Sequence, residues 1–251
     1  MVQAAVGVVG RRIVRRGEGL RGIRIVRYEE YGWLKKSNIQ TVVDIGANEG
    51  QFARLAAELF PAARILSFEP LPDVYERLVR SMRGHPRFDA YRYALSDENG
   101  VATIYRNKFS PSSSLRPMSA IHRELFPHTR ESWREQIDVR RLDDLLSGID
   151  LQDNILVKID VQGYEDRVIA GAMRVIGRAS LVVVETGLVE LYLGGSAFAG
   201  TVEALRKGGL EFAGFLQQIC APDGRPVEGD AVFVRDWAGR EYREADGSGG
   251  V

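Results

Sequence analysis

The sequence predicts an α/β fold built on a doubly wound, mainly parallel sheet. Apolar runs of strand length alternate with segments of helical periodicity through the middle of the 251-residue chain. This alternation is typical of parallel strands that are covered by helices on both faces and joined by right-handed crossovers. A hairpin pattern around PDGRP at 222–226 adds an antiparallel edge near the C-terminus.

Each element follows from its own local pattern. Strands are expected where apolar residues run together, at 41–47, 64–70, 88–96, 155–163 and 180–187. Helices are expected where apolar residues recur with helical spacing, at 51–60, 72–82, 164–176 and 201–209. The turn DENG leads into 101–107, which is expected to return antiparallel to the third strand.

The chain is expected to divide into three parts. Residues 1–38 form a basic N-terminal helix or arm, residues 39–237 the α/β domain, and residues 238–251 a disordered tail. The pattern breaks at 108–135, where three prolines, a serine cluster and two histidines indicate an insertion that acts as a lid or substrate wall. A plain surface excursion is the alternative for this insertion.

Composition excludes several classes of protein. The 34 basic residues balance the 34 acidic ones, so no bulk charge favours nucleic acid. Cys220 is the only cysteine, which fits a cytoplasmic protein without intrachain disulfides. No apolar run approaches the ~20 residues of a membrane-spanning helix. Seven arginines before residue 28 indicate contact with a membrane surface or acidic partner, or else a solvated arm.

The stretch DIGANEG at 44–50 joins the first strand to its helix. Gly46 and Gly50 would let a ligand approach the backbone at the sheet edge where doubly wound folds bind ligands. The pattern G-x-G-x-x-G, which cradles a pyrophosphate, is not matched. Asp44 and Glu49 add two carboxylates, which would repel a pyrophosphate. They favour a cationic ligand without phosphate, such as S-adenosylmethionine.

The second and third strands end in further candidate ligand-binding residues. Glu69 closes the second strand, 25 residues after Asp44. A carboxylate there can accept both hydroxyls of a ribose, at roughly the ~20-residue offset from the glycine turn that this role requires. After the third strand, Leu95, Ser96 and Asp97 lie where an adenine edge would be bound. Surface charge is the alternative for a lone glutamate.

Seven ordered motifs between about Thr41 and Val234 together resemble the FkbM-type methyltransferases: VVDIGANEGQF, SFEPLPDVYERL, ALSDENG, SSSL, RRLDDLL, LVKIDVQGYEDRVIAGA and VVVETG. These enzymes use S-adenosylmethionine and have the Rossmann-like class I methyltransferase fold. The resemblance implies a seven-stranded sheet in the order 3-2-1-4-5-7-6, with strand 7 antiparallel. It also implies methyl transfer to a hydroxyl oxygen of a small molecule, sugar or glycolipid.

Motif by motif, the resemblance also implies positions for the cofactor. The expected cofactor-binding residues are Asp44, Gly46, Ala47, Asn48, Glu49, Gly50, Phe52, Glu69, Pro70, Leu95, Ser96 and Asp160. Asp44, Gly46, Asn48 and Gly50 would line the methionine end, and Asp160 would face the reaction centre. The serines at 112–114 match the family's SSL stretch and are expected to approach the active site.

The stretch KIDVQGYE carries the expected catalytic residues. Lys158 and Asp160 lie on one face of a strand by its period of two, and Glu185 ends the next strand at the same rim. Asp160 would orient the methionine ammonium or the acceptor, and Lys158 would position Asp160 or polarise an oxygen. A purely structural Lys158–Asp160 pair is the alternative. No metal ligands are assigned, although Asp160 and Glu185 could share a divalent ion.

Other candidates and alternatives stay open. His122 and His128 are candidate bases by their place in the insertion, or surface histidines, and Tyr164, Glu190 and Tyr192 are expected to line the acceptor pocket. An amine or carboxylate acceptor, a nicotinamide-dependent dehydrogenase and a non-catalytic binding module are the alternative functions. The expected partner is a small-molecule or glycan acceptor and not nucleic acid; a homo-oligomer stays open.

Overall fold

The computed structural model describes residues 24–27 and 32–235. Eight strands form the main sheet in the order β1 (Arg24–Arg27), β10 (Glu211–Cys220), β11 (Pro226–Val234), β9 (Ala179–Gly187), β8 (Ile155–Ile159), β2 (Thr41–Ile45), β3 (Arg64–Phe68) and β4 (Phe88–Tyr91). The strands from β9 to β4 are parallel, and β11 is antiparallel to both of its neighbours. The α/β fold with a mainly parallel sheet is therefore confirmed.

The sheet differs in detail from the expected seven strands, because β1 adds an eighth strand at the edge beyond β10. The basic N-terminal segment was expected to form a helix or an arm, and its residues Arg24–Arg27 form this strand. Residues 1–23 and the tail at 238–251 lie outside the described residues. The hairpin of β10 and β11 around PDGRP is confirmed.

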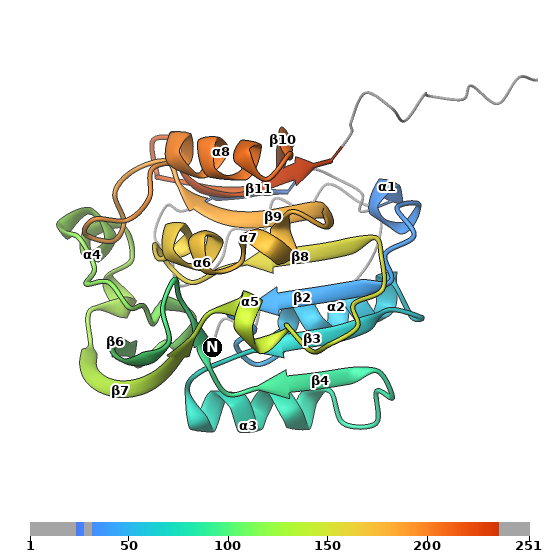
Figure 1. The fold of residues 1–251 in the computed structure, drawn as a ribbon. Helices are drawn as coiled ribbons and strands as arrows, with labels where there is room; N and C mark the ends of the chain where they lie inside the picture. Colours follow the sequence, from blue (N-terminus) through green and yellow to red (C-terminus); the bar gives the residue numbers. More distant parts are fainter. Residues whose placement is uncertain (1–23, 28–31, 236–251) are drawn as a thin grey trace, which may run out of the picture.

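Helices cover both faces of the main sheet (Figure 1). They are α1 (Gly32–Lys35), α2 (Gln51–Leu59), α3 (Pro72–Ser81), α5 (Leu142–Leu145), α6 (Glu165–Gly171), α7 (Met173–Ile176) and α8 (Phe198–Lys207). Buried residues of α2 and α3 pack on one face, and those of α5, α6, α7 and α8 pack on the other. None of the described helices combines the length and hydrophobicity that crossing a lipid bilayer requires.

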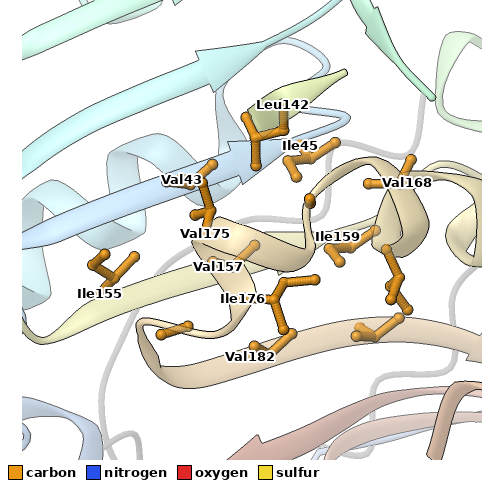
Figure 2. Close-up of a cluster of buried hydrophobic side chains, with 14 of the residues drawn as sticks. Val43, Ile45, Leu142, Ile155, Val157, Ile159, Val168, Val175, Ile176 and Val182 are labelled. Atoms are coloured by element: carbon orange, nitrogen blue, oxygen red, sulfur yellow. The ribbon is translucent and has the colours of Figure 1, made fainter. Parts of the chain in front are cut away.

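The larger core lies under α6 and α7. Alternate residues of the parallel strands, such as Val43 and Val157, meet Val168, Val175 and Ile176 there (Figure 2). This face is apolar along each strand. On the opposite face the same alternation places Asp44 and Lys158, so the sheet's period of two directs the charged side chains toward α2.

A second, three-stranded sheet has the order β5 (Ala94–Leu95), β7 (Ser132–Arg140) and β6 (Gly100–Asn107). The continuous strand expected at 88–96 is wrong, because the chain leaves the main sheet after Tyr91 and β5 pairs with β7 instead. The return at 100–107 is antiparallel, but its partner is also β7. A local apolar pattern marks strand residues without specifying which strand they pair with.

The insertion at 108–135 contains two short 3-10 helices, η1 (Ser110–Ser112) and η2 (Pro127–Thr129), with α4 (Ala120–Leu125) between them. Its last residues begin β7. Figure 1 places β6, β7 and α4 beyond the ends where the parallel strands finish. The insertion thus stands at the edge of the sheet that carries the candidate site.

The helix expected at 164–176 is broken at Ala172 into α6 and α7. The Asp143 carboxylate accepts hydrogen bonds from the backbone N–H groups of Arg174, at 2.9 Å, and Val175, at 3.1 Å. These bonds cap a new helix N-terminus. Gly171, just before the break, lies against the backbone of Ser96 and Asp97 and so positions the loop after β5.

Gly171→Ala should destabilise the fold, because its Cβ would lie 1.9 Å from the Ser96 carbonyl oxygen and both partners are backbone atoms. We expect the free energy of unfolding to fall by roughly 1–3 kcal/mol in urea denaturation. Gly200→Ala in α8 is the matched control, since nothing lies within 4 Å of its Cβ position. It should stabilise the chain by about 0.5–1 kcal/mol. Equal effects of the two changes would contradict the packing argument.

Candidate functional site

The glycine turn (residues 46–50) joins β2 to α2 with three residues in the left-handed region: Gly46, Asn48 and Gly50, with φ of 75°, 46° and 84°. A Cβ on Gly46 would lie 1.8 Å from the Asp160 carbonyl oxygen, and one on Gly50 would lie 2.6 Å from Ser81 Oγ. Gly46 is therefore required by a backbone contact within the chain itself, whereas at Gly50 the nearest atoms belong to side chains and the positive φ is the stronger reason for glycine. Ala47, between them, is buried.

Glu69, the first residue after β3, joins this turn to the second strand. It is only 5% exposed. Its Oε2 accepts a hydrogen bond from Asn48 N at 3.1 Å, and its Oε1 accepts one from Leu71 N at 2.9 Å. Burial raises the pKa of Glu69 to about 7 despite these two bonds. Each carboxylate oxygen keeps one lone pair for a further donor.

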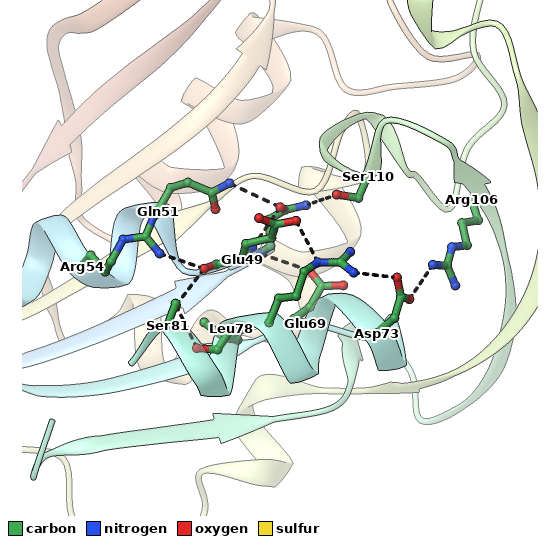
Figure 3. A network of polar contacts seen from close by, with 11 residues as sticks. Glu49, Gln51, Arg54, Glu69, Asp73, Leu78, Ser81, Arg106 and Ser110 are labelled. Atoms are coloured by element: carbon green, nitrogen blue, oxygen red, sulfur yellow. Dashed lines mark hydrogen bonds and ion pairs between the residues drawn. The ribbon is translucent and has the colours of Figure 1, made fainter. Parts of the chain in front are cut away.

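A polar network links the glycine turn to the second sheet (Figure 3). The Glu49 carboxylate pairs with Arg77 at 2.8 Å, Arg77 pairs with Asp73 at 3.1 Å, and Arg106 of β6 bonds the same Asp73. Asn48 Nδ2 donates to Ser110 Oγ of the insertion at 3.2 Å. Because Arg77 already compensates Glu49, that carboxylate contributes less negative charge to the turn than its sequence position indicates.

The residues expected near the adenine lie together beside β5. Ser96 Oγ is 3.1 Å from Asp97 Oδ1 and 3.2 Å from the Tyr164 hydroxyl. Leu95 differs from them, because its side chain belongs to the main hydrophobic core. Pro70 is half-buried beside Glu69.

A charged cluster fills the rim between β2 and β8. The parallel register places Asp44 beside both Ser67 and Lys158. Lys158 Nζ donates to Asp160 Oδ2 at 2.9 Å, lies 4.0 Å from Asp44 Oδ1, and sits 5.9 Å from the centre of the Phe52 ring. Asp44 is fully buried, and its Oδ1 has no hydrogen-bond partner among the described residues.

The electrostatics of this cluster separate its two carboxyl groups. Burial raises the pKa of Asp44 to about 6, although Lys158 opposes the shift. Burial acts in the same direction on Asp160, but the Lys158 ammonium and hydrogen bonds from Glu185 and Gln162 together hold the pKa of Asp160 below its ordinary value. Asp160 therefore stays ionised at neutral pH.

Gln162 connects Asp160 to Glu185 at the end of β9. Its Nε2 donates to Asp160 Oδ1 at 2.9 Å and also to Glu185 Oε2. Its Oε1 accepts from the Tyr192 hydroxyl at 2.7 Å, and its backbone oxygen accepts from Ser114 Oγ at 2.6 Å. Burial, followed by the nearby charge of Asp160, raises the pKa of Glu185 well above its ordinary value.

A cavity of about 570 Å³ opens beside Glu185, and we call it the carboxyl cavity. Its lining includes the carboxyl groups Glu165, Glu185, Glu190 and Glu228, with Tyr192 and Phe198 as aromatic walls. Burial raises the pKa of Glu165 to about 7 and that of Glu228 to about 8. The volume lies within the roughly 300–1,000 Å³ of ligand sites. Tyr164, expected here, lies instead beside Ser96.

Two residues of the site, Gln162 and Glu228, were not identified from the sequence. Gln162 stands within KIDVQGYE, where a signal existed: an amide two residues after a strand-ending aspartate can bond that aspartate. Glu228 gave no such signal. Its position follows from the pairing of β11 with β9, which sets Glu228 opposite Gly187.

The two histidines of the insertion do not line the carboxyl cavity. His122 is 2% exposed, so the alternative of a surface histidine is wrong for it. Its ring packs on Tyr192, with 4.9 Å between ring centroids, and burial lowers the pKa of His122 to about 4. His122 is therefore neutral and supports the wall of the cavity. His128 is exposed on η2.

The described residues contain no group of three or more His, Cys, Asp or Glu side chains arranged to hold a metal ion. The Gln162 amide donates to both Asp160 Oδ1 and Glu185 Oε2. Among the described residues, these two carboxyl groups therefore offer no preformed site for a shared divalent ion.

Known proteins resemble this chain over most of its length. The sequence model of one protein family, described as the Methyltransferase FkbM domain, matches residues 44–212. The 2-O-methyltransferase NoeI of Sinorhizobium fredii is 31% identical over 198 residues, which cover 76% of this chain and 78% of NoeI. The AMB antimetabolite synthetase AmbE of Pseudomonas aeruginosa is 27% identical, over 83% of this chain but only 12% of AmbE.

Among solved structures, a putative rRNA-methylase from Clostridium thermocellum is similar with a TM-score of 0.46 and 9% identity, over 80% of this chain and 90% of that one. A TM-score this low does not show a relationship. The family of this chain is shown by the matched family model and by the similarity to NoeI. The chain belongs to the FkbM methyltransferase family.

Proposed function

We propose that this chain transfers a methyl group from S-adenosylmethionine to a hydroxyl oxygen of a sugar, glycolipid or other hydroxylated small molecule. One observation carries the proposal: Gln162 holds an ionised carboxylate, Asp160, beside a carboxyl of raised pKa, Glu185, which lines a cavity of ligand size. Membership of the FkbM family and the similarity to a 2-O-methyltransferase support the same reaction.

The residues after β2 and β3 fit the cofactor. Glu69 is fixed by two backbone N–H groups and keeps a free lone pair on each oxygen, as two ribose hydroxyls require. Ser96 and Tyr164 offer hydroxyl groups beyond the next strand. When bound, S-adenosylmethionine supplies a methyl carbon on a positively charged sulfur, so the donor is already activated.

The chain's own residues then align the acceptor and remove its proton. The ionised form of Glu185 receives the proton that the acceptor hydroxyl loses on methylation. Its raised pKa makes it a stronger base than an ordinary carboxylate, and Gln162 fixes its orientation. Asp160 stays ionised beside Lys158 and favours positive charge near the reaction centre.

Methylation of an amine is the second candidate. The carboxyl groups of Glu165, Glu185 and Glu228 line one cavity and would stabilise an ammonium as well as accept hydroxyl hydrogens. Labelled methyl donor tested against hydroxylated acceptors and their amino analogues separates the two reactions.

Glu69→Gln should weaken binding of S-adenosylhomocysteine by more than about tenfold in calorimetric titration, because the ionised form accepts two hydroxyl hydrogens. Binding to the unchanged chain should tighten as the pH rises through about 7, where Glu69 loses its proton. The variant should lack this dependence. Glu76→Gln, an exposed position on α3, is the control and should bind normally. Unchanged affinity of Glu69→Gln would remove the ribose assignment.

Glu185→Gln should lower kcat by roughly 10²–10⁴-fold, the usual contribution of a general base. In the unchanged chain, kcat should rise with pH through the raised pKa of Glu185, since only the ionised form accepts a proton. The variant should lose this acidic limb of the pH profile. An acidic limb that survives in Glu185→Gln would assign the base to another group.

Glu228→Gln should move the acidic limb of the pH profile of kcat to lower pH. Glu228 lies in the same buried cluster, and its charge disfavours ionisation of Glu185. Glu190→Gln is the matched control, because Glu190 lines the same cavity while its carboxylate accepts from Gly194 N at 2.9 Å. It should leave the limb in place. A limb at the same pH in both variants would show that Glu185 titrates independently of Glu228.

A further inference from the structure

A second cavity, of about 250 Å³, lies between the insertion and the strands β6 and β7. We call it the arginine cavity. Its lining includes Ser112, Arg116, Arg123, Ser132, Trp133 and Arg134. Among the described residues, none that lines it is acidic. Three arginines therefore border one hollow that no acidic residue lines.

The charge of this cavity is largely uncompensated. Arg123 and Arg134 take part in none of the ion pairs between described residues, and the Arg134 guanidinium lies over the Tyr105 ring, 5.4 Å from the ring centre. The neighbouring acids Glu131 and Glu135 are engaged elsewhere, with Lys108 at 3.2 Å and Arg106 at 3.0 Å. An anion entering the cavity would thus meet positive charge that no side chain has already neutralised.

Arg116 adds a buried donor. Its side chain is 13% exposed and pairs with Asp166 through Nη2 at 2.8 Å. Its Nη1 is enclosed and has no hydrogen-bond partner among the described residues. The Arg116 guanidinium also lies over the Tyr164 ring, 5.4 Å from the ring centre, so Asp166 and Tyr164 fix this residue at the border of the cavity.

The size of the cavity limits the ligand. A volume of about 250 Å³ is below the roughly 300–1,000 Å³ of sites that enclose a whole small molecule. It suits one group of a larger ligand. Guanidinium groups bind phosphate through paired N–H donors. The hydroxyls of Ser112 and Ser132 and the exposed ring of Trp133 complete a wall that an ester substituent could contact.

The arginine cavity adjoins the carboxyl cavity. Met118 of its lining forms a β-bridge with Tyr192, and the Ser112 oxygen lies 3.4 Å from the Tyr192 hydroxyl. Tyr192 itself lines the carboxyl cavity. One aromatic residue therefore stands between a cationic hollow and an acidic one. The acidic cavity would repel an anion, so a ligand that spans both is held in one direction.

We propose that the arginine cavity binds a phosphate ester group of the methyl acceptor. This inference rests on the proposed function for the identity of the ligand, while phosphate binding itself does not depend on methyl transfer. Phenyl phosphate and inorganic phosphate, compared by calorimetry at equal ionic strength, are the probes. The unchanged chain should bind phenyl phosphate more tightly than inorganic phosphate. Binding of inorganic phosphate alone would overturn the assignment to an ester.

The double change Arg123→Gln with Arg134→Gln should weaken phenyl phosphate binding by at least about tenfold, since two charge-assisted contacts are lost. Arg83→Gln with Arg92→Gln is the matched control, because it removes two exposed arginines away from the cavity. It should change binding less than about twofold. Equal losses in both double variants, or no binding to the unchanged chain, would contradict the proposal.

Titration with S-adenosylhomocysteine on the same variants separates this inference from the proposed function. Both double variants should bind it normally, because none of these arginines contacts the glycine turn or Glu69. A chain that binds the nucleoside but not phenyl phosphate would refute the arginine cavity alone. A chain that binds phenyl phosphate but not the nucleoside would refute the proposed function and the acceptor assignment with it.

Discussion

The contact between two backbones organises the candidate site. Gly46, just past β2, lies against the carbonyl oxygen of Asp160, just past β8, so closely that a Cβ would reach 1.8 Å from that oxygen. Asp160 N also donates to the Ile45 oxygen at 3.0 Å, which locks the two strand ends together. The positive φ of Gly46 gives a second reason for glycine. Because Asp160 is fixed in this way, its carboxylate meets Lys158, and the Gln162 amide can bridge it to Glu185.

Burying several carboxyl groups at one rim is tolerable only because they do not all carry charge. Lys158 is the cation that contacts Asp160, at 2.9 Å, and that pair keeps Asp160 ionised. Burial and the charge of Asp160 raise the pKa values of Glu185 and Glu228, although Lys158 also acts on Glu185, so both carboxyl groups bind a proton more readily than ordinary ones. This arrangement divides the acids into one that holds charge and others whose pKa values are raised. Proton exchange and fixed charge are the two tasks that the proposed reaction assigns to this rim.

Sequence periodicity was sufficient to predict the elements whose structure depends on nearby residues. The alternation of strands and helices, the ends of β2 and β3, and the hairpin of β10 and β11 all follow from patterns within about ten residues of each element. Pairing between distant segments was not predictable: the chain changes sheets after Tyr91, and Glu228 reaches the site only because β11 lies beside β9. Ala172 breaks a continuous helical pattern because Asp143, far away in sequence, caps the second half. The negative charge expected at the glycine turn was overestimated for the same reason, because Arg77, which lies on α3, pairs with Glu49.

Tyr192 is where these long-range contacts converge. It is 3% exposed, with His122 packed on its ring and Gln162 accepting from its hydroxyl. Its backbone bridges to Met118, so the same residue belongs to the wall between the insertion and the main sheet. A side chain held at so many points cannot swing aside without breaking the Gln162 bond, and that bond orients the amide between Asp160 and Glu185. The insertion therefore does more than cover the sheet edge, because Tyr192 couples the packing of the insertion to the geometry of Asp160 and Glu185.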